Sequence, residues 1–507
     1  MATKDKNKTE FGDWQTNDDL ALSICRVIKN SGISPQVIIE PTCGRGSFLF
    51  AALETFDSIE EVWGIDINQD YIKYLEHSFE IKGIKSLVKT HLIHGDIFKL
   101  NFHEIQNSIN GRKVLIIGNP PWVTNSTQGG IKSENLPQKS NIKGEKGLDA
   151  ITGKSNFDIA EFITIKLIET FHNENAHLVF LLKNQVIKNL TYLQKNKQYS
   201  IAKIQQLKID AKKEFEVCVS ASVLRMDFGT PKTYQCCVED FYTQEEIKKF
   251  GWEGTNFVSN LENYKSFKDI DGVSPLIWRS GVKHDCSKVM ELTLSEKGFY
   301  NGLGEKVDIE EDAIYPLLKS SDISKHEKTI GRKFVIVTQH STNEDTQVLA
   351  FSVPKTYNYL KTHATFLDSR KSSIYKNRPR FSLFGIGEYS FQKYKVAISG
   401  MYKNSYFALI SPYKGKPVMC DDTCYSLGFD DYDTASVIQK VLNGKLVQSF
   451  IASLSFEDSK RVINKDLLMR IDLRTISLIF TREELGLSSQ EYTLFRSLFS
   501  TNQLPLF

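Results

Sequence analysis

Short apolar segments alternate with amphipathic segments through the first 235 residues, and this alternation restricts the fold more than any other feature. It predicts strands and helices in turn. The strands are expected at Val37–Glu40, Glu61–Ile67, His91–His94, Lys113–Ile117 and His177–Leu182, and the helices at Phe48–Thr55, Tyr71–Glu80 and Phe157–Phe171. Strands separated by helices predict an α/β, doubly wound domain whose parallel sheet is covered on both faces.

The alternation ends near residue 235, so we expect two domains, 1–235 and 236–507. The second has short strands, turns and many aromatic residues, with helices predicted at Ala435–Leu454 and Gln490–Leu498. It is expected to be a separate mixed α+β domain, whose topology the sequence leaves open. Within the first domain, residues 123–155 are polar and rich in glycine and lysine. A long segment of this kind predicts a mobile loop that acts as a lid.

The composition describes a globular protein with large cores, because 41% of the residues are hydrophobic and 25% are charged. No apolar stretch approaches the roughly 18 residues of a membrane helix, and the polar N-terminus lacks a secretory signal. We therefore expect a cytoplasmic protein with no membrane partner. The eight cysteines are scattered and have no zinc-type spacing, so no metal site is expected.

A glycine-containing turn follows the first strand, in the sequence Glu40-Pro41-Thr42-Cys43-Gly44-Arg45-Gly46. Glycines let the backbone approach a ligand, and the next helix directs its amides at the same place. Asp66 ends the second strand, where a carboxylate can accept hydrogen bonds from ribose hydroxyls. There is no third glycine at dinucleotide spacing and no Walker lysine, so a diphosphate is disfavoured. With Glu40 at the first strand end, S-adenosylmethionine fits, since it carries an amino group and a sulfonium but no phosphate.

The tetrapeptide Asn119-Pro120-Pro121-Trp122 follows the buried fourth strand and is the most specific motif in the chain. Pro121 forces Pro120 into an extended conformation, which leaves the Pro120 carbonyl free to point outward. Asn119 adds a side-chain carbonyl, so two acceptors can hold the two hydrogens of an exocyclic amine. The nitrogen lone pair is then drawn out of conjugation and directed at a sulfonium methyl. Trp122 offers a flat face on which a base can stack.

These residues, with Asp96 after the third strand, resemble the amino-type DNA adenine methyltransferases of the γ arrangement. The resemblance implies a Rossmann-like domain that uses S-adenosylmethionine, followed by a target-recognition domain. It implies that Asn119 and Pro120 hold the target amine and that Trp122 and Phe215 enclose a flipped adenine. The family's N-terminal motif falls on Gly12–Thr16. The implied cofactor-binding residues are Thr16, Glu40, Pro41, Thr42, Gly44, Gly46, Asp66, Ile67, Asp96, Ile97 and Asn119.

Residues 370–416 contain ten lysines and arginines but one acid, Glu388, with ten aromatic residues interleaved. Such a stretch is typical of a surface that binds a phosphate backbone, so double-stranded DNA is the expected partner. The residues predicted to contact DNA are Arg370, Lys371, Lys376, Arg378, Arg380, Lys393 and Lys395. No nuclease motif is evident, and any cleavage is expected from a separate cognate endonuclease of a restriction–modification system, acting at the nucleoid of a bacterial or archaeal cell.

Three other substrates suit the same tetrapeptide: the N4 amine of cytosine, a protein glutamine and an RNA base. Asparagine at its first position resembles the adenine group, whereas serine is more typical of cytosine enzymes. A glutamine methyltransferase has no need of about 270 further residues with a basic segment. The remaining alternative is a non-catalytic DNA-specificity subunit, against which the acids at 40, 66 and 96 argue because they are intact.

Overall fold

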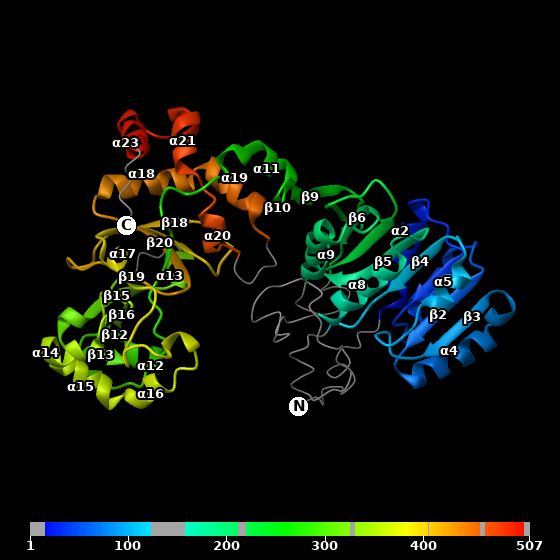
Figure 1. Ribbon diagram of the computed structural model, residues 1–507, viewed down its shortest axis with the longest axis horizontal. Coiled ribbons are helices and arrows are strands. Elements are labelled where there is room, and N and C mark those ends of the chain that lie inside the picture. Colours follow the sequence, from blue (N-terminus) through cyan, green and yellow to red (C-terminus); the bar gives the residue numbers. More distant parts are fainter. Residues whose placement is uncertain are drawn as a thin grey trace. The chain divides into compact units, whose positions relative to one another are not determined.

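In the computed structural model, a ten-stranded sheet forms the centre of the N-terminal half of the chain (Figure 1). The structure describes residues 16–122, 158–210, 220–324, 330–403, 405–456 and 462–500. The strand order is β10-β9-β8-β6-β7-β5-β4-β1-β2-β3. The strands are β1 (Val37–Glu40), β2 (Glu61–Asp66), β3 (Lys89–His94), β4 (Val114–Gly118), β5 (Ala176–Lys183), β6 (Ile201–Lys208), β7 (Ala221–Phe228), β8 (Gln235–Asp240), β9 (Glu246–Glu253) and β10 (Asn256–Val258).

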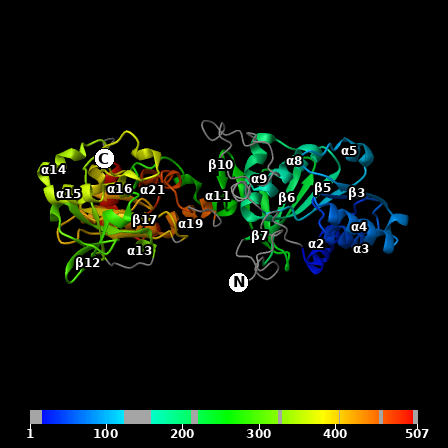
Figure 2. The same ribbon diagram turned by 90° about the horizontal axis from the view of Figure 1, so that it is seen from below.

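Strands β3, β2, β1, β4 and β5 are parallel, and β7 runs antiparallel to both of its neighbours, β5 and β6. Figure 2 shows α2, α3 and α4 on one face of this sheet and α5, α8 and α9 on the other. These helices are α2 (Asp18–Asn30), α3 (Ser47–Thr55), α4 (Gln69–Ile81), α5 (His103–Ile109), α8 (Ile159–Phe171) and α9 (Asn184–Lys197). The predicted α/β, doubly wound class is confirmed.

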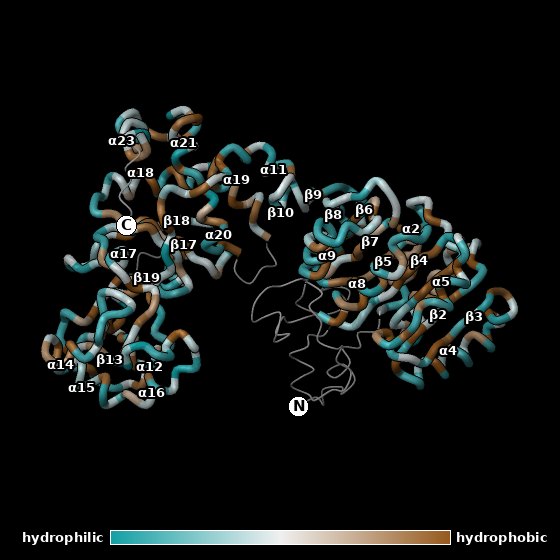
Figure 3. Tube along the Cα trace, viewed as in Figure 1, coloured by the Kyte–Doolittle hydropathy of each residue, from teal (hydrophilic) through white to brown (hydrophobic). Residues whose placement is uncertain are grey.

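Burial explains why these segments adopt these structures. All five residues of β4 are buried, as expected of a central strand covered on both faces. In α4, Ile72, Leu75 and Phe79 are buried at helical spacing, and Asn68 caps the first turn. Figure 3 shows the corresponding changes between apolar and polar residues along the helices.

The first compact unit of the chain runs to Glu262, beyond the boundary near residue 235 that the sequence suggested. Strand β8 pairs in parallel with β6, and β9 and β10 extend the sheet from there. Three strands that the sequence assigned to the second domain therefore belong to the first sheet. Near residue 235 the strands cease to be connected by helices and become connected by hairpins. In the sequence this change of pattern looks the same as a domain boundary.

The second compact unit, Asn263–Phe507, contains two sheets and a group of C-terminal helices. One sheet has the order β14-β13-β12-β16-β15-β19 and the other β11-β20-β17-β18. Their strands are β11 (Arg279–Ser280), β12 (Glu291–Ser295), β13 (Gly298–Asn301), β14 (Lys306–Val307), β15 (Ile314–Leu318), β16 (Lys333–Ile336), β17 (Tyr394–Ser399), β18 (Phe407–Ile410), β19 (Met419–Cys420) and β20 (Cys424–Phe429). The mixed α+β architecture agrees with the sequence.

The helices of this unit are mostly short, and one predicted helix is wrong. The expected helix Ala435–Leu454 is two helices, α18 (Tyr432–Asn443) and α19 (Lys445–Leu454), because the backbone of Gly444 between them is extended. The predicted helix Gln490–Leu498 corresponds to α23 (Ser489–Phe499). Helix α11 (Leu261–Phe267) spans the boundary between the two units. The remaining helices are α12 (Ser287–Met290), α13 (Ser320–Ser324), α14 (Leu349–Ser352), α15 (Pro354–Thr362), α16 (Ala364–Asp368), α17 (Glu388–Phe391), α20 (Lys465–Leu468), α21 (Leu473–Ile479) and α22 (Arg482–Leu485).

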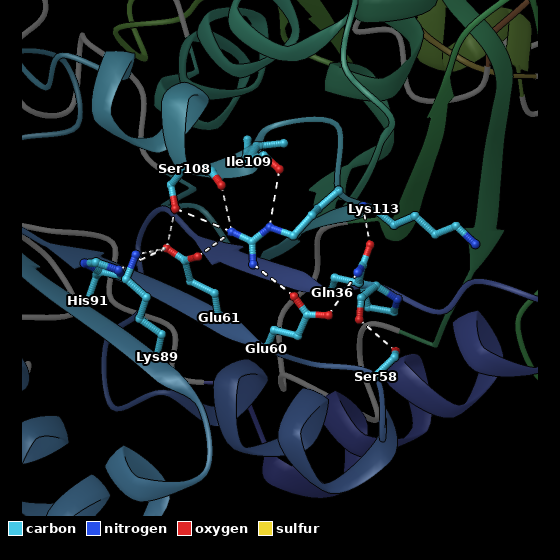
Figure 4. Close-up of polar contacts among 11 residues, drawn as sticks. Gln36, Ser58, Glu60, Glu61, Lys89, His91, Ser108, Ile109 and Lys113 are labelled. Atoms are coloured by element: carbon cyan, nitrogen blue, oxygen red, sulfur yellow. Dashed lines mark hydrogen bonds and ion pairs between the residues drawn. The ribbon is translucent and has the colours of Figure 1, made fainter.

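A network of charged side chains holds the amino-terminal edge of the first sheet (Figure 4). Glu61, the first residue of β2, is its centre, and only 2% of its side chain is exposed. Its carboxylate accepts hydrogen bonds from Arg112 and, at 2.6 Å, from the Ser108 hydroxyl, and Lys89 Nζ lies 3.3 Å away. Because the functional residues predicted from the sequence follow the carboxyl ends of the strands, this network lies at the opposite edge of the sheet.

Candidate functional site

The carboxyl ends of β1, β2 and β4 bring Glu40, Asp66 and Asn119 to one edge of the sheet. Strand β1 lies between β2 and β4 and is parallel to both, with Glu40 the last residue of β1 and Asp66 the last residue of β2. Asn119 directly follows β4. The strand order reverses between β1 and β4, which is where open α/β sheets bind ligands.

The turn between β1 and α3 is fixed by hydrogen bonds from its own backbone. The Cys43 N–H donates to the Ile65 carbonyl at 2.9 Å, and the Gly46 N–H donates to the Cys43 carbonyl at 2.7 Å. Gly46 has a φ of 83°, and a Cβ at this position would lie 2.4 Å from Leu75 Cδ2. Glycine is therefore required here both by the backbone conformation and by the close approach of α4.

Asp66 joins this turn to the end of β2. Its Oδ2 accepts the Gly44 N–H at 2.8 Å, and its Oδ1 accepts the Asn68 N–H at 2.7 Å. These two contacts fix the orientation of the carboxylate at the end of β2. Ile67, the next residue, is 42% exposed, which is high for a large apolar side chain beside a buried strand.

Glu40 is a buried acid without a cationic partner in the described part of the chain. It is 3% exposed, and its Oε2 accepts the Leu49 N–H at 3.1 Å. Burial raises the pKa of its carboxyl well above the usual value, and the nearby Asp66 raises it further. A positively charged ligand group at this position would relieve both effects. Close by in sequence, the hydroxyl oxygen of Thr42 is buried without a hydrogen-bond partner among the described residues.

Asp96 and Ile97 lie in a turn after β3 that a lysine from α8 stabilises. Asp96 Oδ1 accepts the Phe98 N–H at 2.9 Å. Lys166 Nζ donates to the carbonyls of Ile97 and Phe98, each at 2.8 Å. Burial lowers the pKa of Lys166. The sequence analysis missed Lys166, although a lysine within the apolar helix Ile159–Phe171 was a visible signal.

The structure brings Thr16 to the tetrapeptide, over a separation of more than a hundred residues. Asn119 Nδ2 donates to Thr16 Oγ1 at 3.2 Å, and Ser47 Oγ donates to the Thr16 carbonyl at 3.1 Å. Thr16 is 7% exposed. It therefore links the tetrapeptide to the first turn of α3, and it sets the orientation of the Asn119 amide.

Trp122 is 9% exposed, and its indole N–H donates to the Leu181 carbonyl of β5 at 3.2 Å. The edge of the ring is thus fixed against the sheet. Phe215, the second predicted stacking residue, lies outside the described residues, as do Gly12 and the predicted loop 123–155.

The basic segment of the second unit requires a correction at Lys395. This residue belongs to β17, is 2% exposed and donates to the Gln392 carbonyl at 2.9 Å, and burial lowers the pKa of its ammonium to about 8. A side chain buried in a strand cannot contact a DNA backbone. Arg370 is also engaged, since its guanidinium donates to four carbonyl oxygens and lies over the Tyr375 ring. The exposed residues are Lys371, Lys376, Arg378, Arg380 and Lys393.

No group of three or more histidine, cysteine, aspartate or glutamate side chains in the described residues could hold a metal ion. None of the helices described is long and apolar enough to cross a membrane.

The fold is that of Rossmann-like methyltransferases with an additional domain. In a solved structure in complex with DNA, the type IIL restriction–modification enzyme MmeI has a similar fold, with a TM-score of 0.51 over 97% of this chain and 73% of that enzyme. The sequence identity is 11%, so this similarity concerns the fold alone. No family model matches the chain.

Similarity in sequence identifies the family. The chain is 39% identical to the type II methyltransferase M.NspV of Nostoc sp. over 478 residues, which are 94% of this chain and 98% of that protein. It is 22% identical to the type II methyltransferase M.BanIII of Aneurinibacillus aneurinilyticus over 427 residues, 72% of each chain. The protein belongs to the type II methyltransferase family.

Proposed function

We propose that this protein transfers the methyl group of S-adenosylmethionine to the N6 amine of a flipped-out adenine in double-stranded DNA. The observation that carries the proposal is the position of Asn119-Pro120-Pro121-Trp122 at the carboxyl end of β4, beside Glu40, in a type II methyltransferase. The protein would be the modification enzyme of a restriction–modification system, with a separate endonuclease as its cognate partner.

The residues at the carboxyl edge of the first sheet fit S-adenosylmethionine. Glu40 is a buried acid whose raised pKa a cationic amino group would lower, and the Thr42 hydroxyl is buried without a partner among the described residues. Asp66, held at the end of β2, would accept hydrogen bonds from the ribose hydroxyls, and the exposed Ile67 would offer an apolar surface to the adenine ring. Asp96 would accept a hydrogen bond from the adenine amine, and Ile97 would lie beside the cofactor. The cofactor supplies an electrophilic methyl group on a sulfonium.

Asn119 and the Pro120 carbonyl would accept the two hydrogens of the target amine. The Asn119 amide directs its Nδ2 at Thr16, so its Oδ1 faces the other side. Two acceptors that hold the amine draw the nitrogen lone pair out of conjugation with the ring. The amine proton becomes acidic only after methyl transfer, so no strong base is needed. Catalysis then depends on positioning and electrostatics.

Trp122 would provide one face of the base pocket, with its ring edge already fixed against β5. Stacking on an aromatic ring contributes about 1–3 kcal/mol per base. Phe215 stays our proposal for the second face.

The second unit would recognise DNA. Exposed cationic side chains in its basic segment supply the charge that a phosphate backbone requires, and we now restrict the proposed contacts to Lys371, Lys376, Arg378, Arg380 and Lys393. Of these, Arg380 pairs with Asp368 at 2.5 Å and is therefore partly neutralised.

The test is methylation of unmodified DNA by the purified protein with S-adenosylmethionine, followed by digestion to nucleosides and mass spectrometry. We expect N6-methyladenine. N4-methylcytosine without methyladenine would contradict the choice of base, and activity on RNA or on a glutamine peptide but not on DNA would contradict the choice of substrate. In the variant Asn119→Ala, turnover should disappear while DNA affinity stays, because the lost contact acts mainly in the transition state.

A further inference from the structure

The last residue of β5, Lys183, contacts the end of the tetrapeptide directly. Its ammonium donates to the Trp122 carbonyl at 3.2 Å and to Asp158 Oδ2 at 2.7 Å. The side chains of Lys183 and Asp158 are only 21% and 11% exposed. An ion pair this sheltered from water is screened less than a surface pair and holds its geometry more firmly.

Strand β5 therefore holds Trp122 at two points. The Leu181 carbonyl accepts the indole N–H, and Lys183, two residues further along the same strand, donates to the Trp122 carbonyl. One contact fixes the ring and the other fixes the backbone. Neither depends on a ligand.

Asp158 fixes the position of the Lys183 ammonium. Its Oδ1 accepts the Ala160 N–H at 3.1 Å and so caps the first turn of α8, while its Oδ2 receives Lys183. The carboxylate thus has one oxygen on the helix and one on the lysine, which leaves the Lys183 ammonium little freedom to leave the Trp122 carbonyl.

The contact between Lys183 and the Trp122 carbonyl affects catalysis because the tetrapeptide is rigid between its two ends. Pro120 and Pro121 have fixed φ angles, so a rotation at Trp122 is transmitted to the Pro120 carbonyl. Thr16 holds the other end through the Asn119 amide. A misplacement of about 1 Å in a reacting geometry can cost roughly 100-fold in rate.

We propose that Lys183, held by Asp158, is a positioning residue that orients Trp122 and the Pro120 carbonyl for the target base. The inference rests on the proposed function, because it assigns these two groups to the base pocket. Lys183 touches neither the base nor the methyl group in this role.

The experiment compares Lys183→Met, which keeps the length of the side chain without its charge, with Lys183→Arg, which keeps the charge. Lys197→Met is the matched control, since Lys197 also pairs with a carboxylate, Glu169 at 3.2 Å, but at the far end of α9. Each variant is measured for kcat on DNA, for the Kd of S-adenosylmethionine, and by fluorine NMR after labelling with 5-fluorotryptophan. Trp122→Phe assigns the Trp122 resonance among the five tryptophans.

We expect Lys183→Met to lower kcat by roughly 10- to 100-fold, because Trp122 and the Pro120 carbonyl would no longer be held in the reacting geometry. The Kd of S-adenosylmethionine should change less than about twofold, since uniform binding is unaffected. Only the Trp122 resonance should shift, and Lys183→Arg should restore both the resonance and most of kcat.

Two results would overturn the inference. One is a Lys183→Met enzyme with the wild-type kcat and the wild-type Trp122 resonance. The other is a simultaneous change of all resonances and of cofactor affinity, or an equal effect of Lys197→Met, either of which would show a general structural role. If the wild-type protein methylates no DNA, the proposed function fails by itself, and the Trp122 resonance still decides whether Lys183 anchors that residue.

Discussion

Replacing Glu61 by glutamine should destabilise the first unit in a pH-dependent manner. Burial by itself would raise the pKa of Glu61, but hydrogen bonds from Arg112 and Ser108, with the charge of Lys89, outweigh burial and lower the pKa from 4.5 to about 2. A shift of this size corresponds to about 3 kcal/mol at neutral pH. Because Lys89 is largely in solvent, screening reduces the effect, and we expect Glu61→Gln to cost about 2 kcal/mol.

The direction of the pH dependence follows from the lowered pKa. The folded chain binds fewer protons at Glu61 than the unfolded chain, so the stabilisation is complete above about pH 5.5 and is lost as the pH falls from 4.5 toward 2. The difference between wild type and Glu61→Gln should therefore be largest near pH 7. It should shrink by roughly a quarter at pH 4 and by more than half at pH 3.

The two units can unfold separately, so the assay must follow the first unit by itself. Hydrogen exchange of peptides from β1, β2 and β3, measured across a urea series at each pH, does this. Glu60→Gln is the matched control, because Glu60 also pairs with Arg112, at 3.3 Å, but is 54% exposed. It should cost much less than Glu61→Gln, because solvent screens an exposed ion pair. Equal losses in the two variants, or a Glu61→Gln effect that is constant from pH 7 to pH 3, would refute the reasoning.

Three further predictions concern the proposed ligands. Asp66→Ala should weaken S-adenosylmethionine binding roughly 10- to 100-fold in calorimetry, since charged hydrogen bonds are lost; an unchanged affinity in a folded variant would remove Asp66 from the cofactor site. Gly46→Ala should lower the thermal midpoint and the cofactor affinity, because its Cβ would meet Leu75 Cδ2 at 2.4 Å at a φ of 83°; adding Leu75→Ala should relieve the overlap but not the backbone strain. Changing Lys371, Lys376 and Lys393 to glutamate should lower the salt slope of DNA binding by about 2.7, at roughly 0.9 per phosphate contact, and an unchanged slope would show an exposed surface with no role in binding.

The sequence predicted the parallel core of the first sheet well because buried strands and amphipathic helices have different periods. The strand Val37–Glu40 was predicted with its observed bounds, and the predicted site residues Glu40, Asp66 and Asn119 lie at one edge of the sheet. Strands β8, β9 and β10 follow one another without intervening helices, so the alternation of strand and helix patterns is lost there. This is why the sequence assigned them to the second domain.

Side-chain partners were less predictable than strand positions. Lys395 was expected on a DNA-binding surface because charge is normally exposed, but it lies in a strand among buried neighbours. Lys166 and Lys183 were missed for the complementary reason. The ammonium of each lysine donates to backbone carbonyls that are distant in sequence. A sequence pattern does not show which carbonyls will lie near a given side chain.

The two ends of β2 have opposite electrostatic roles, and this explains how the fold tolerates a buried acid, Glu40, beside Asp66. At the carboxyl end, Asp66 lies close enough to the buried Glu40 to raise its pKa further, which is unfavourable without a cationic ligand. At the amino end, Glu61 has its pKa lowered by the cationic and polar groups around it, which is favourable. The five intervening peptide links keep these acids apart, so the amino edge can offset the cost of the carboxyl edge without neutralising it. A cationic ligand at Glu40 is therefore expected to stabilise the first unit further, because it would offset the burial of this carboxylate.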